Sequence, residues 1–448
     1  MKRISILTIL LLLTAFHLAA AELMDMIGKD FKIFSESRPR FIKPSNARFF
    51  RWTSDEKVAA RYPAYQNISE ILTLLGQPVS EVIVHFKGNL VSSIYISVYN
   101  RGDNRPINGE QFHQMMKKLY DQLKTLYPNE KPVSRKAKIS EGVFVNAIIW
   151  RGKKFSCTMK WSLSGKNKRT ERPEYLQVEF EPFDPARDPA KRPLARADRT
   201  GIVARKNLPE NVKRDRAGNV YIDNIPMVDQ GDKGYCVAAV LERVLRYYNV
   251  PVNQHTIAQL CGTTASGGTS TEAMVRTLED VSIKFGVKIR DQYQLFDNRN
   301  AIKKLEQIVS EYNRVARREK KEEVKMVIRG RMVFLDETIF SMDPEIYAKV
   351  RNEDSDYRDF YRTITKNVLD GVPVIWCVML GIMPEEKLSP QSRGGHMRLI
   401  IGFNNKNQEI LYTDTWGLGH ELKSMPIQHA WPITTRLLYL IPRERKRY

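Results

Sequence analysis

Apolar residues follow two different spacings in the first part of the chain, and each spacing predicts a different kind of element. Short apolar, β-branched runs at 82–86 and 92–98 flank Lys87-Gly88-Asn89, which predicts a β-hairpin. Residues 109–126 instead repeat apolar side chains at helical spacing, which predicts an amphipathic helix. Further apolar runs predict strands at 143–150, 155–163 and 175–180.

The last half of the chain has a pattern of helices first and strands afterwards. Helical spacing covers 236–248, 256–261, 271–285 and 357–369. Apolar, β-branched runs predict strands at 372–380, 396–403, 410–414 and 436–441. A charged helical stretch near 300–325 interrupts this pattern, so we expect an insertion over about 291–350.

The two patterned regions are separated by residues 186–216, where proline alternates with Arg and Lys and apolar residues become sparse. Such a composition predicts an extended, solvated linker. We therefore expect an N-terminal α+β domain over 22–185 and a second α+β domain over 217–448. A chain of 448 residues is long enough for two domains, and 42% hydrophobic content excludes extensive disorder.

The beginning of the chain predicts an export signal over residues 1–21. Lys2-Arg3 precede a mostly apolar run at 4–16, and Ala19-Ala20-Ala21 provides a small-residue cleavage site. The run is short for a membrane span, and an uncleaved anchor is the alternative. We expect a signal peptide, a mature chain without a transmembrane domain, and a secreted, periplasmic or cell-surface location.

The net charge of +21 favours contact with anionic surfaces but does not identify a partner. The chain lacks an aromatic-interleaved basic motif and zinc-finger spacing, so we expect no specific nucleic-acid partner. No cysteine pair has zinc-ligand spacing, and we expect neither a metal nor a cofactor.

Four cysteines occur in the chain, at Cys157, Cys236, Cys261 and Cys377. If Cys236 is a nucleophile, the remaining three cannot all pair within the chain. Cys261 and Cys377 lie in the same predicted domain, and both a disulfide and two buried free thiols are open possibilities.

The segment Gln230-Gly-Asp-Lys-Gly-Tyr-Cys236 places a thiol at the start of a predicted helix. A helix N-terminus and an imidazolium partner both lower the pKa of a thiol, and the thiolate is the nucleophile. Gln230 precedes Cys236 by six residues (236 − 230 = 6) and is a candidate oxyanion donor together with the Cys236 backbone N–H.

A base and its orienting group are found near the end of the chain. His396 begins an apolar strand after Gly394-Gly395, and Asp414 ends the next one. Adjacent antiparallel strands bring such residues side by side, so Asp414 can fix the imidazole while Trp416 shields their bond. His420 and His429 are competitors, but neither begins an apolar strand.

These motifs together resemble the papain-like cysteine peptidase superfamily. The matching residues are Gln230-Gly231, Cys236, His396 with Gly402-Phe403, and Asp414-Thr415-Trp416-Gly417. The resemblance covers about 217–442. It implies the two-lobed papain-like fold with Cys236 as nucleophile, His396 as base and acid, Asp414 as orienter and Gln230 in the oxyanion hole.

This sequence departs from papain in three places. Val237 replaces the Trp that usually follows the nucleophile, Lys233 stands where papain has a disulfide cysteine, and Asp414 replaces Asn. An Asp at that position resembles the bacteriocin-leader-processing branch. Candidate substrate-binding positions are Gly267, Gly268, Gly395 and Trp416.

The leading hypothesis is an exported cysteine peptidase that hydrolyses peptide or protein substrates through a thioacyl-enzyme. A transglutaminase-like acyltransferase and a catalytically inactive peptidase-like binding module are the alternatives. Asp229, Asp232 and Glu242, near the nucleophile, are expected to face solvent or to act as capping carboxylates. The N-terminal domain is an inhibitory propeptide, a targeting module or a structural appendage.

Overall fold

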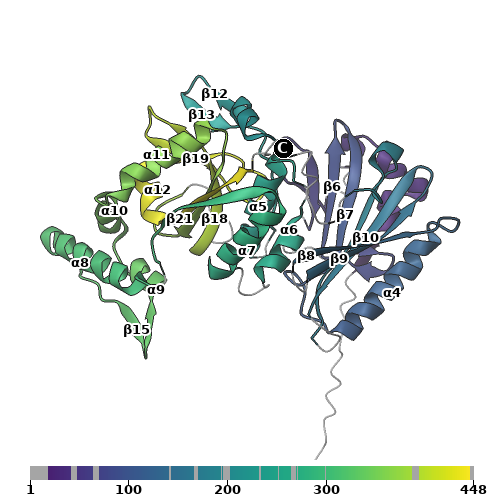
Figure 1. Cartoon of the computed structure of the whole chain (residues 1–448), viewed down its shortest axis with the longest axis horizontal. Coiled ribbons are helices and arrows are strands. Elements are labelled where there is room, and N and C mark those ends of the chain that lie inside the picture. Colours follow the sequence, from purple (N-terminus) through teal and green to yellow (C-terminus); the bar gives the residue numbers. More distant parts are fainter. Residues whose placement is uncertain are drawn as a thin grey trace, which may run out of the picture.

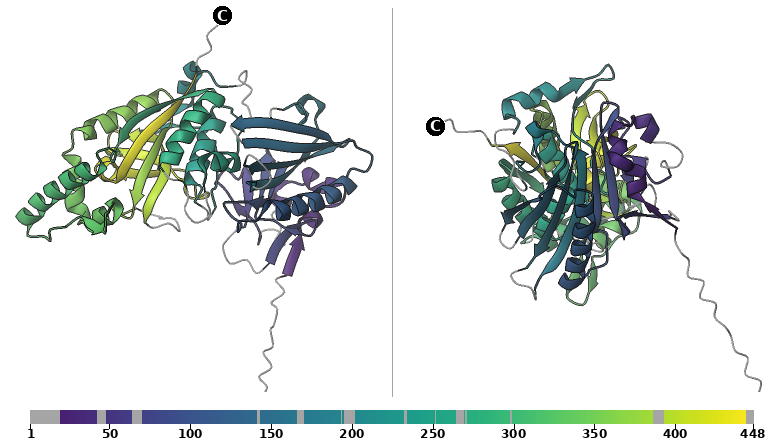
Figure 2. Two further views of the ribbon diagram at one scale, coloured as in Figure 1. Left: turned by 60° about the horizontal axis from the view of Figure 1, so that its bottom comes forward. Right: turned by 90° about the vertical axis from the view of Figure 1, so that its right-hand side faces the viewer.

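The computed structural model describes residues 19–41, 48–63, 70–140, 143–165, 170–192, 194, 202–231, 234–250, 252–263, 269, 271–297, 299–385 and 393–443. Residues 1–18 of the predicted signal peptide lie outside this part of the chain, as do Gly267 and Gly268. The described chain has mixed α+β structure in two units, the first over 19–194 and the second over 202–443. The two units lie side by side (Figures 1 and 2).

An eight-stranded antiparallel sheet forms the body of the first unit, in the order β2-β3-β6-β7-β11-β10-β9-β8. Its strands are β2 (Arg51–Trp52), β3 (Ala59–Tyr62), β6 (Glu81–Lys87), β7 (Leu90–Asn100), β8 (Val133–Ser140), β9 (Val143–Arg151), β10 (Phe155–Ser164) and β11 (Arg172–Pro182). The predicted hairpin is confirmed as β6 and β7, and the three further predicted strands are β9, β10 and β11.

The remaining elements of the first unit surround this sheet. They are β1 (Ala19–Glu22), β4 (Glu70–Leu74), β5 (Gln77–Pro78), α1 (Leu23–Ile27), η1 (Lys29–Ser35), α2 (Arg38–Phe41), α4 (Gly109–Thr125) and η2 (Pro185–Arg187). Helix α4 begins where predicted because Asn108 and Gln111 form a reciprocal capping box.

The two faces of the first sheet differ because strand side chains alternate between faces. On β11, Leu176, Val178 and Phe180 are buried in the same hydrophobic core as the inner face of α4. The intervening residues are polar, and Gln177 bonds to Asn253 of the second unit. The apolar face therefore packs under α4, and the polar face is turned toward the second unit (Figure 1).

The second unit contains an antiparallel sheet in the order β12-β13-β18-β17-β21-β14, with β19 paired to β18 and β20 paired to β19. Its strands are β12 (Val212–Arg214), β13 (Asn219–Ile222), β14 (Val287–Gln294), β17 (Val374–Leu380), β18 (Gly394–Asn404), β19 (Glu409–Thr413), β20 (Lys423–Pro426) and β21 (Thr434–Pro442). The four strands predicted near the end of the chain are confirmed as β17, β18, β19 and β21.

Helices of the second unit lie on both sides of this sheet. They are η3 (Arg205–Asn211), α5 (Cys236–Tyr247), α6 (Gln254–Cys261), α7 (Thr271–Lys284), α8 (Ala301–Glu319), α9 (Leu335–Phe340), α10 (Pro344–Asn352), α11 (Asp356–Leu369) and α12 (Ile427–Ile433), and a hairpin of β15 (Val327–Arg329) and β16 (Met332–Phe334) joins α8 to α9. Helices α5, α6 and α7 lie toward the first unit, whereas α8 and α9 lie at the far end (Figure 1).

Two segments are more ordered than their composition suggests. Within the expected linker, residues 205–214 form η3 and β12, and Leu208 is fully buried in the core of the second unit. Residues 291–294, expected to begin the insertion, are the last four residues of β14 and pair with β21. Within the described ranges, none of the helices has the length and apolar run that a bilayer crossing requires.

Candidate active site

Cys236 is the first residue of α5, a helix that is buried on nearly all sides. The helix packs against β18 on one side and lies toward the first unit on the other (Figure 1). The positive end of the helix dipole is therefore at the thiol, as the helical spacing predicted. Cys236 as a residue is only partly buried.

His396 lies on β18, and Asp414 directly follows β19, the strand paired with β18. The Leu399–Thr413 pair ends the ladder, which brings the carboxylate of Asp414 beside the imidazole. His396 Nε2 lies 3.2 Å from Asp414 Oδ1, and both side chains are fully buried. The side-by-side placement expected from adjacent antiparallel strands is observed.

The thiol and the imidazole shift each other's protonation toward an ion pair. Burial alone raises the pKa of the Cys236 thiol, but the neighbouring His396 and the backbone N–H groups of Met397 and Val237 outweigh burial and lower it. Burial alone lowers the pKa of His396, but Asp414 and Cys236 outweigh burial and raise it. The site therefore favours a thiolate beside an imidazolium.

The two ring nitrogens of His396 have separate roles. Nε2 is bonded to Asp414, whereas Nδ1 is buried and has no hydrogen-bond partner of ordinary geometry within the described residues. Nδ1 is therefore the nitrogen left to exchange a proton with Cys236. The indole of Trp416 stacks on the imidazole at a centroid distance of 4.1 Å, which fixes the ring plane and covers one face of the pair.

Gln230 is buried and is held by Thr415, the residue between Asp414 and Trp416. The Gln230 backbone N–H donates to the Thr415 carbonyl at 2.8 Å. The Thr415 hydroxyl donates to the side-chain oxygen Oε1 of Gln230 at 2.5 Å. These two bonds orient the side-chain amide of Gln230. Its oxygen accepts the bond from Thr415, and its NH₂ group is the part of the amide that can donate to an oxyanion.

Asp414 is surrounded by cations that the sequence motifs did not reveal. Arg398 Nε lies 2.8 Å from Oδ1, and Lys423 Nζ lies 3.1 Å from Oδ2. Burial alone raises the pKa of Asp414, but Arg398 and His396 hold it well below its usual range. Arg398 is itself fully buried and bonded to both carboxylate oxygens of Glu385, at 2.9 and 2.7 Å.

The competing histidines occupy different places. His420 lies on the other side of the Asp414 carboxylate, with Nδ1 3.9 Å from Oδ2, and its ring meets Trp416 edge-on. The backbone N–H of Asp414 donates to the carbonyl of His420 at 3.0 Å, so His420 helps to hold the acid. His429 lies in α12.

The other three cysteines are free thiols, which answers the open question about a disulfide between Cys261 and Cys377. Burial raises the pKa of both of these thiols to about 12, and it raises the pKa of Cys157 well above the usual value. Cys236 therefore differs from the other cysteines of the chain, because it alone has a lowered pKa.

The predicted substrate-binding glycine on β18 has open space beside it. A Cβ atom built on Gly395 would meet no atom within 4 Å, and Gly395 is exposed. Of the acids expected to face solvent or to act as caps, Asp232 lies outside the described residues. Neither Asp229 nor Glu242 faces solvent, but Glu242 does cap the first turn of α6. Asp229 is buried and ion-paired with Arg51 of the first unit, and the buried Glu242 accepts a hydrogen bond from the backbone N–H of Gln254 at 2.6 Å.

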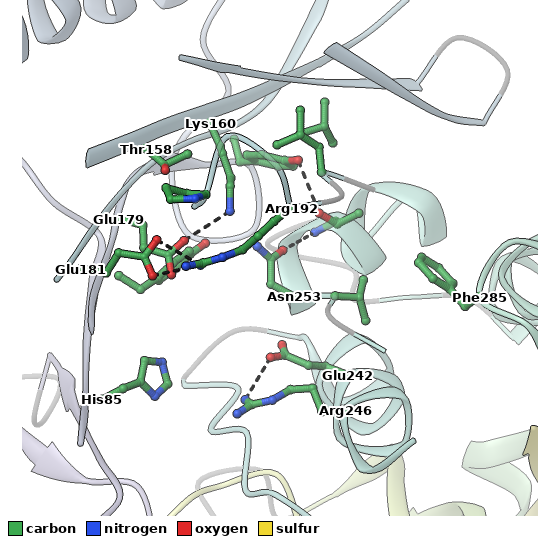
Figure 3. A pocket seen from close by; sticks show the side chains of 17 residues that line it. His85, Thr158, Lys160, Glu179, Glu181, Arg192, Glu242, Arg246, Asn253 and Phe285 are labelled. Carbon is green, nitrogen blue, oxygen red and sulfur yellow. Dashed lines mark hydrogen bonds and ion pairs between the residues drawn. The ribbon is translucent and has the colours of Figure 1, made fainter. Parts of the chain in front are cut away.

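A cavity of about 430 Å³ lies between the two units, bounded by the polar face of β10 and β11 and by the second half of α5 (Figure 3). Most of its charged side chains form ion pairs, which are Lys160–Glu179, Arg192–Glu181 and Arg246–Glu242. Cys236, His396 and Asp414 do not line this cavity, so it is separate from the candidate active site.

Comparison with known proteins identifies no family for this chain. No protein-family model matches it, and no curated protein matches it. Among solved structures, the chain aligns with the crystal structure of xylellain, a cysteine protease from Xylella fastidiosa, at 10% identity and a TM-score of 0.27. The alignment covers 54% of this chain and 90% of that chain. Likeness at this level carries no argument about function.

Proposed function

We propose that this protein is a papain-like cysteine peptidase in which Cys236 is the nucleophile, His396 the base and acid, and Asp414 the orienting group. The observation that carries the proposal is the lowered pKa of the Cys236 thiol beside an imidazole bonded to a buried carboxylate. A helical part bearing Cys236 and a β part bearing His396 support the two-lobed arrangement, with the substrate bound where they meet.

In the first step, the Cys236 thiolate attacks the carbonyl carbon of a peptide bond, and a C–S bond forms as the carbonyl π electrons move to oxygen. The backbone N–H of Cys236 and the amide of Gln230 are the proposed donors to that oxyanion. His396 then gives its Nδ1 proton to the leaving amine as the C–N bond breaks. The product is a thioacyl-enzyme with neutral His396.

In the second step, water attacks the thioacyl carbon while His396 Nδ1 takes one of its protons. The C–S bond breaks, the acid product leaves, and the thiolate–imidazolium pair is restored. Asp414 holds the Nε2 proton throughout, because its carboxylate is bonded to that nitrogen. Trp416 limits water access to this bond from one side.

The proposal is tested by incubating the purified chain with a library of peptides and with an epoxysuccinyl inhibitor, followed by mass spectrometry. We expect hydrolysis, labelling of Cys236, and loss of both in Cys236→Ala. Incorporation of an added amine instead of water would identify an acyltransferase. Normal hydrolysis by Cys236→Ala would refute the proposal.

We further propose that the protein is exported after removal of residues 1–21. Cleavage after Ala21 removes most of β1, but the Glu22 carboxylate remains held by the backbone N–H groups of Leu75 and Gly76 at 2.8 and 2.9 Å. N-terminal sequencing of the protein from its native host tests this proposal. A mature chain beginning at Glu22 is expected. An exported protein whose chain still begins at Met1 would contradict the proposal.

A further inference from the structure

The first unit contacts the loop that carries Gln230 through a partly buried ion pair. Arg51 Nη2 lies 2.9 Å from Asp229 Oδ2, and Arg51 Nε lies 3.2 Å from the same oxygen. The Asp229 side chain is 1% exposed, so its charge depends on partners within the protein. Asp229 directly precedes Gln230, and its Oδ1 accepts the backbone N–H of Gly231 at 2.8 Å.

A second arginine of the first unit, Arg61, packs against the same loop. Arg61 is buried and bonded to Glu81 at 2.8 Å, and Glu81 also bonds to His255 of the second unit at 3.0 Å. The Arg61 guanidinium lies where a side chain at Gly231 would project, and Gly231 has a φ of +68°. The loop therefore turns at Gly231 because both the backbone conformation and the space require glycine.

The other end of the loop is also held by the first unit. Tyr235, the residue before Cys236, is buried, and its hydroxyl donates to Asn100 Oδ1 at 3.3 Å. Its ring lies where a side chain at Gly102 would project. The first unit thus contacts the chain just before Gln230 and just before Cys236, the two groups proposed to bind the oxyanion.

The catalytic strands contact the opposite side of the loop. Asp229 Oδ2 lies 2.6 Å from the position of a Cβ atom built on Gly417, and Gln230 is bonded to Thr415. Asp229 is therefore enclosed between Arg51 and the turn that follows Asp414. A shift of Asp229 toward either side moves Gln230 with it, since the two residues are adjacent in the chain.

We infer that the first unit is needed for full catalytic activity. In this unit, Arg51 acts through Asp229 to hold Gln230 in place for binding the oxyanion. This inference rests on the proposed function. Arg51 is a positioning residue and does not touch the reacting atoms. We therefore infer that the first unit stays in place during catalysis, because its departure would remove the Arg51 partner of Asp229 next to the oxyanion donor.

The test compares Arg51→Ala, Arg51→Lys and a matched control in the full chain. The control is Ser164→Ala, which removes another bond between the units, from Gln259 of α6 to the Ser164 hydroxyl at 3.0 Å, without touching the loop. The measurements are kcat and KM with a peptide amide, and the rate at which iodoacetamide alkylates Cys236.

We expect Arg51→Ala to lower kcat by on the order of tenfold to a hundredfold, because a small displacement of a catalytic group has an effect of this size. Arg51→Lys should restore part of the loss, and Ser164→Ala should stay within about twofold of the parent protein, since effects of distant sites are independent. Alkylation should not change, because the thiolate–imidazolium pair does not use Gln230. Asp229→Asn should add little to Arg51→Ala, since both act through one contact.

Equal turnover in Arg51→Ala and Ser164→Ala would overturn the inference, as would a parallel loss of turnover and alkylation that Arg51→Lys does not reverse. Hydrogen exchange of the 229–235 segment separates this inference from the proposed function. If the parent protein hydrolyses no peptide, the proposed function fails. Faster exchange of this segment in Arg51→Ala than in Ser164→Ala then still supports the positioning role, and equal exchange refutes it.

Discussion

Replacing Asp414 by Asn changes the charge of the site with little change in shape. In the parent protein, His396 Nε2 lies 3.2 Å from Asp414 Oδ1. The Asn side chain keeps an oxygen that can accept this hydrogen bond, but it carries no negative charge. Arg398 and Lys423, which lie 2.8 and 3.1 Å from the carboxylate, lose that counter-ion. The imidazolium form of His396 therefore loses its anionic partner and is left beside two cations.

The sign of the effect follows from the pKa shift of His396. Burial lowers that pKa, and the bond to Asp414 contributes most to raising it, so Asp414→Asn should lower it. A hydrogen bond to a charged group contributes about 1.5–3 kcal/mol. Since one pH unit corresponds to about 1.36 kcal/mol, the alkaline limb of kcat/KM should move down by about one to two pH units.

The assay is the pH dependence of kcat/KM for one peptide amide, measured for the parent protein and for Asp414→Asn. The parent should be active between the lowered pKa of Cys236, below which the thiolate is lost, and the raised pKa of His396, above which the imidazolium is lost. The variant should lose activity at lower pH on the alkaline side. An alkaline limb that coincides with that of the parent, in a variant shown by circular dichroism to be folded, would show that Asp414 does not raise the pKa of His396.

Three further predictions test separate parts of the site. Gln230→Ala should lower kcat by about 10²–10³-fold with alkylation of Cys236 unchanged, because it removes one oxyanion donor; a parallel loss of alkylation argues against that role. Gly417→Ala should destabilise the fold by about 1–3 kcal/mol in urea unfolding, because its φ is +77° and its new methyl group would meet Asp229; unchanged stability contradicts the contact. In folded Cys236→Ala, iodoacetamide should label no cysteine at neutral pH, since burial raises the pKa of the other thiols, and rapid labelling of Cys377 contradicts this.

Regular side-chain spacing predicted most of the long elements but not the short or polar ones. The 109–126 spacing corresponds to α4, and the apolar 396–403 run corresponds to β18. Strand β14 was missed because its sequence, Val-Lys-Ile-Arg-Asp-Gln-Tyr-Gln, is largely polar and only partly buried. It is a strand because β21 provides backbone partners, which is a tertiary effect that spacing along the chain does not reveal.

The candidate site was predicted to the extent that its residues belong to local motifs. Cys236 stands at a helix start, and His396 and Asp414 lie on or directly after neighbouring strands, so short segments predicted their positions. The pair of Arg51 and Asp229 joins residues 178 positions apart, and no local pattern identifies it. Arg398 was within reach of sequence reasoning, because it lies two positions after His396 on a strand and so shares its face.

In the proposed function, the Cys236 sulfur forms a covalent acyl intermediate with the help of His396. Rapid mixing with an activated ester of a short peptide, followed by acid quench, digestion and mass spectrometry, locates the acyl group directly. We expect one acyl group on Cys236 that hydroxylamine removes, and strongly slowed acylation in His396→Ala at neutral pH. An acyl group on a different cysteine, or acylation of Cys236 at an equal rate without His396, would rule out the proposed roles of Cys236 and His396.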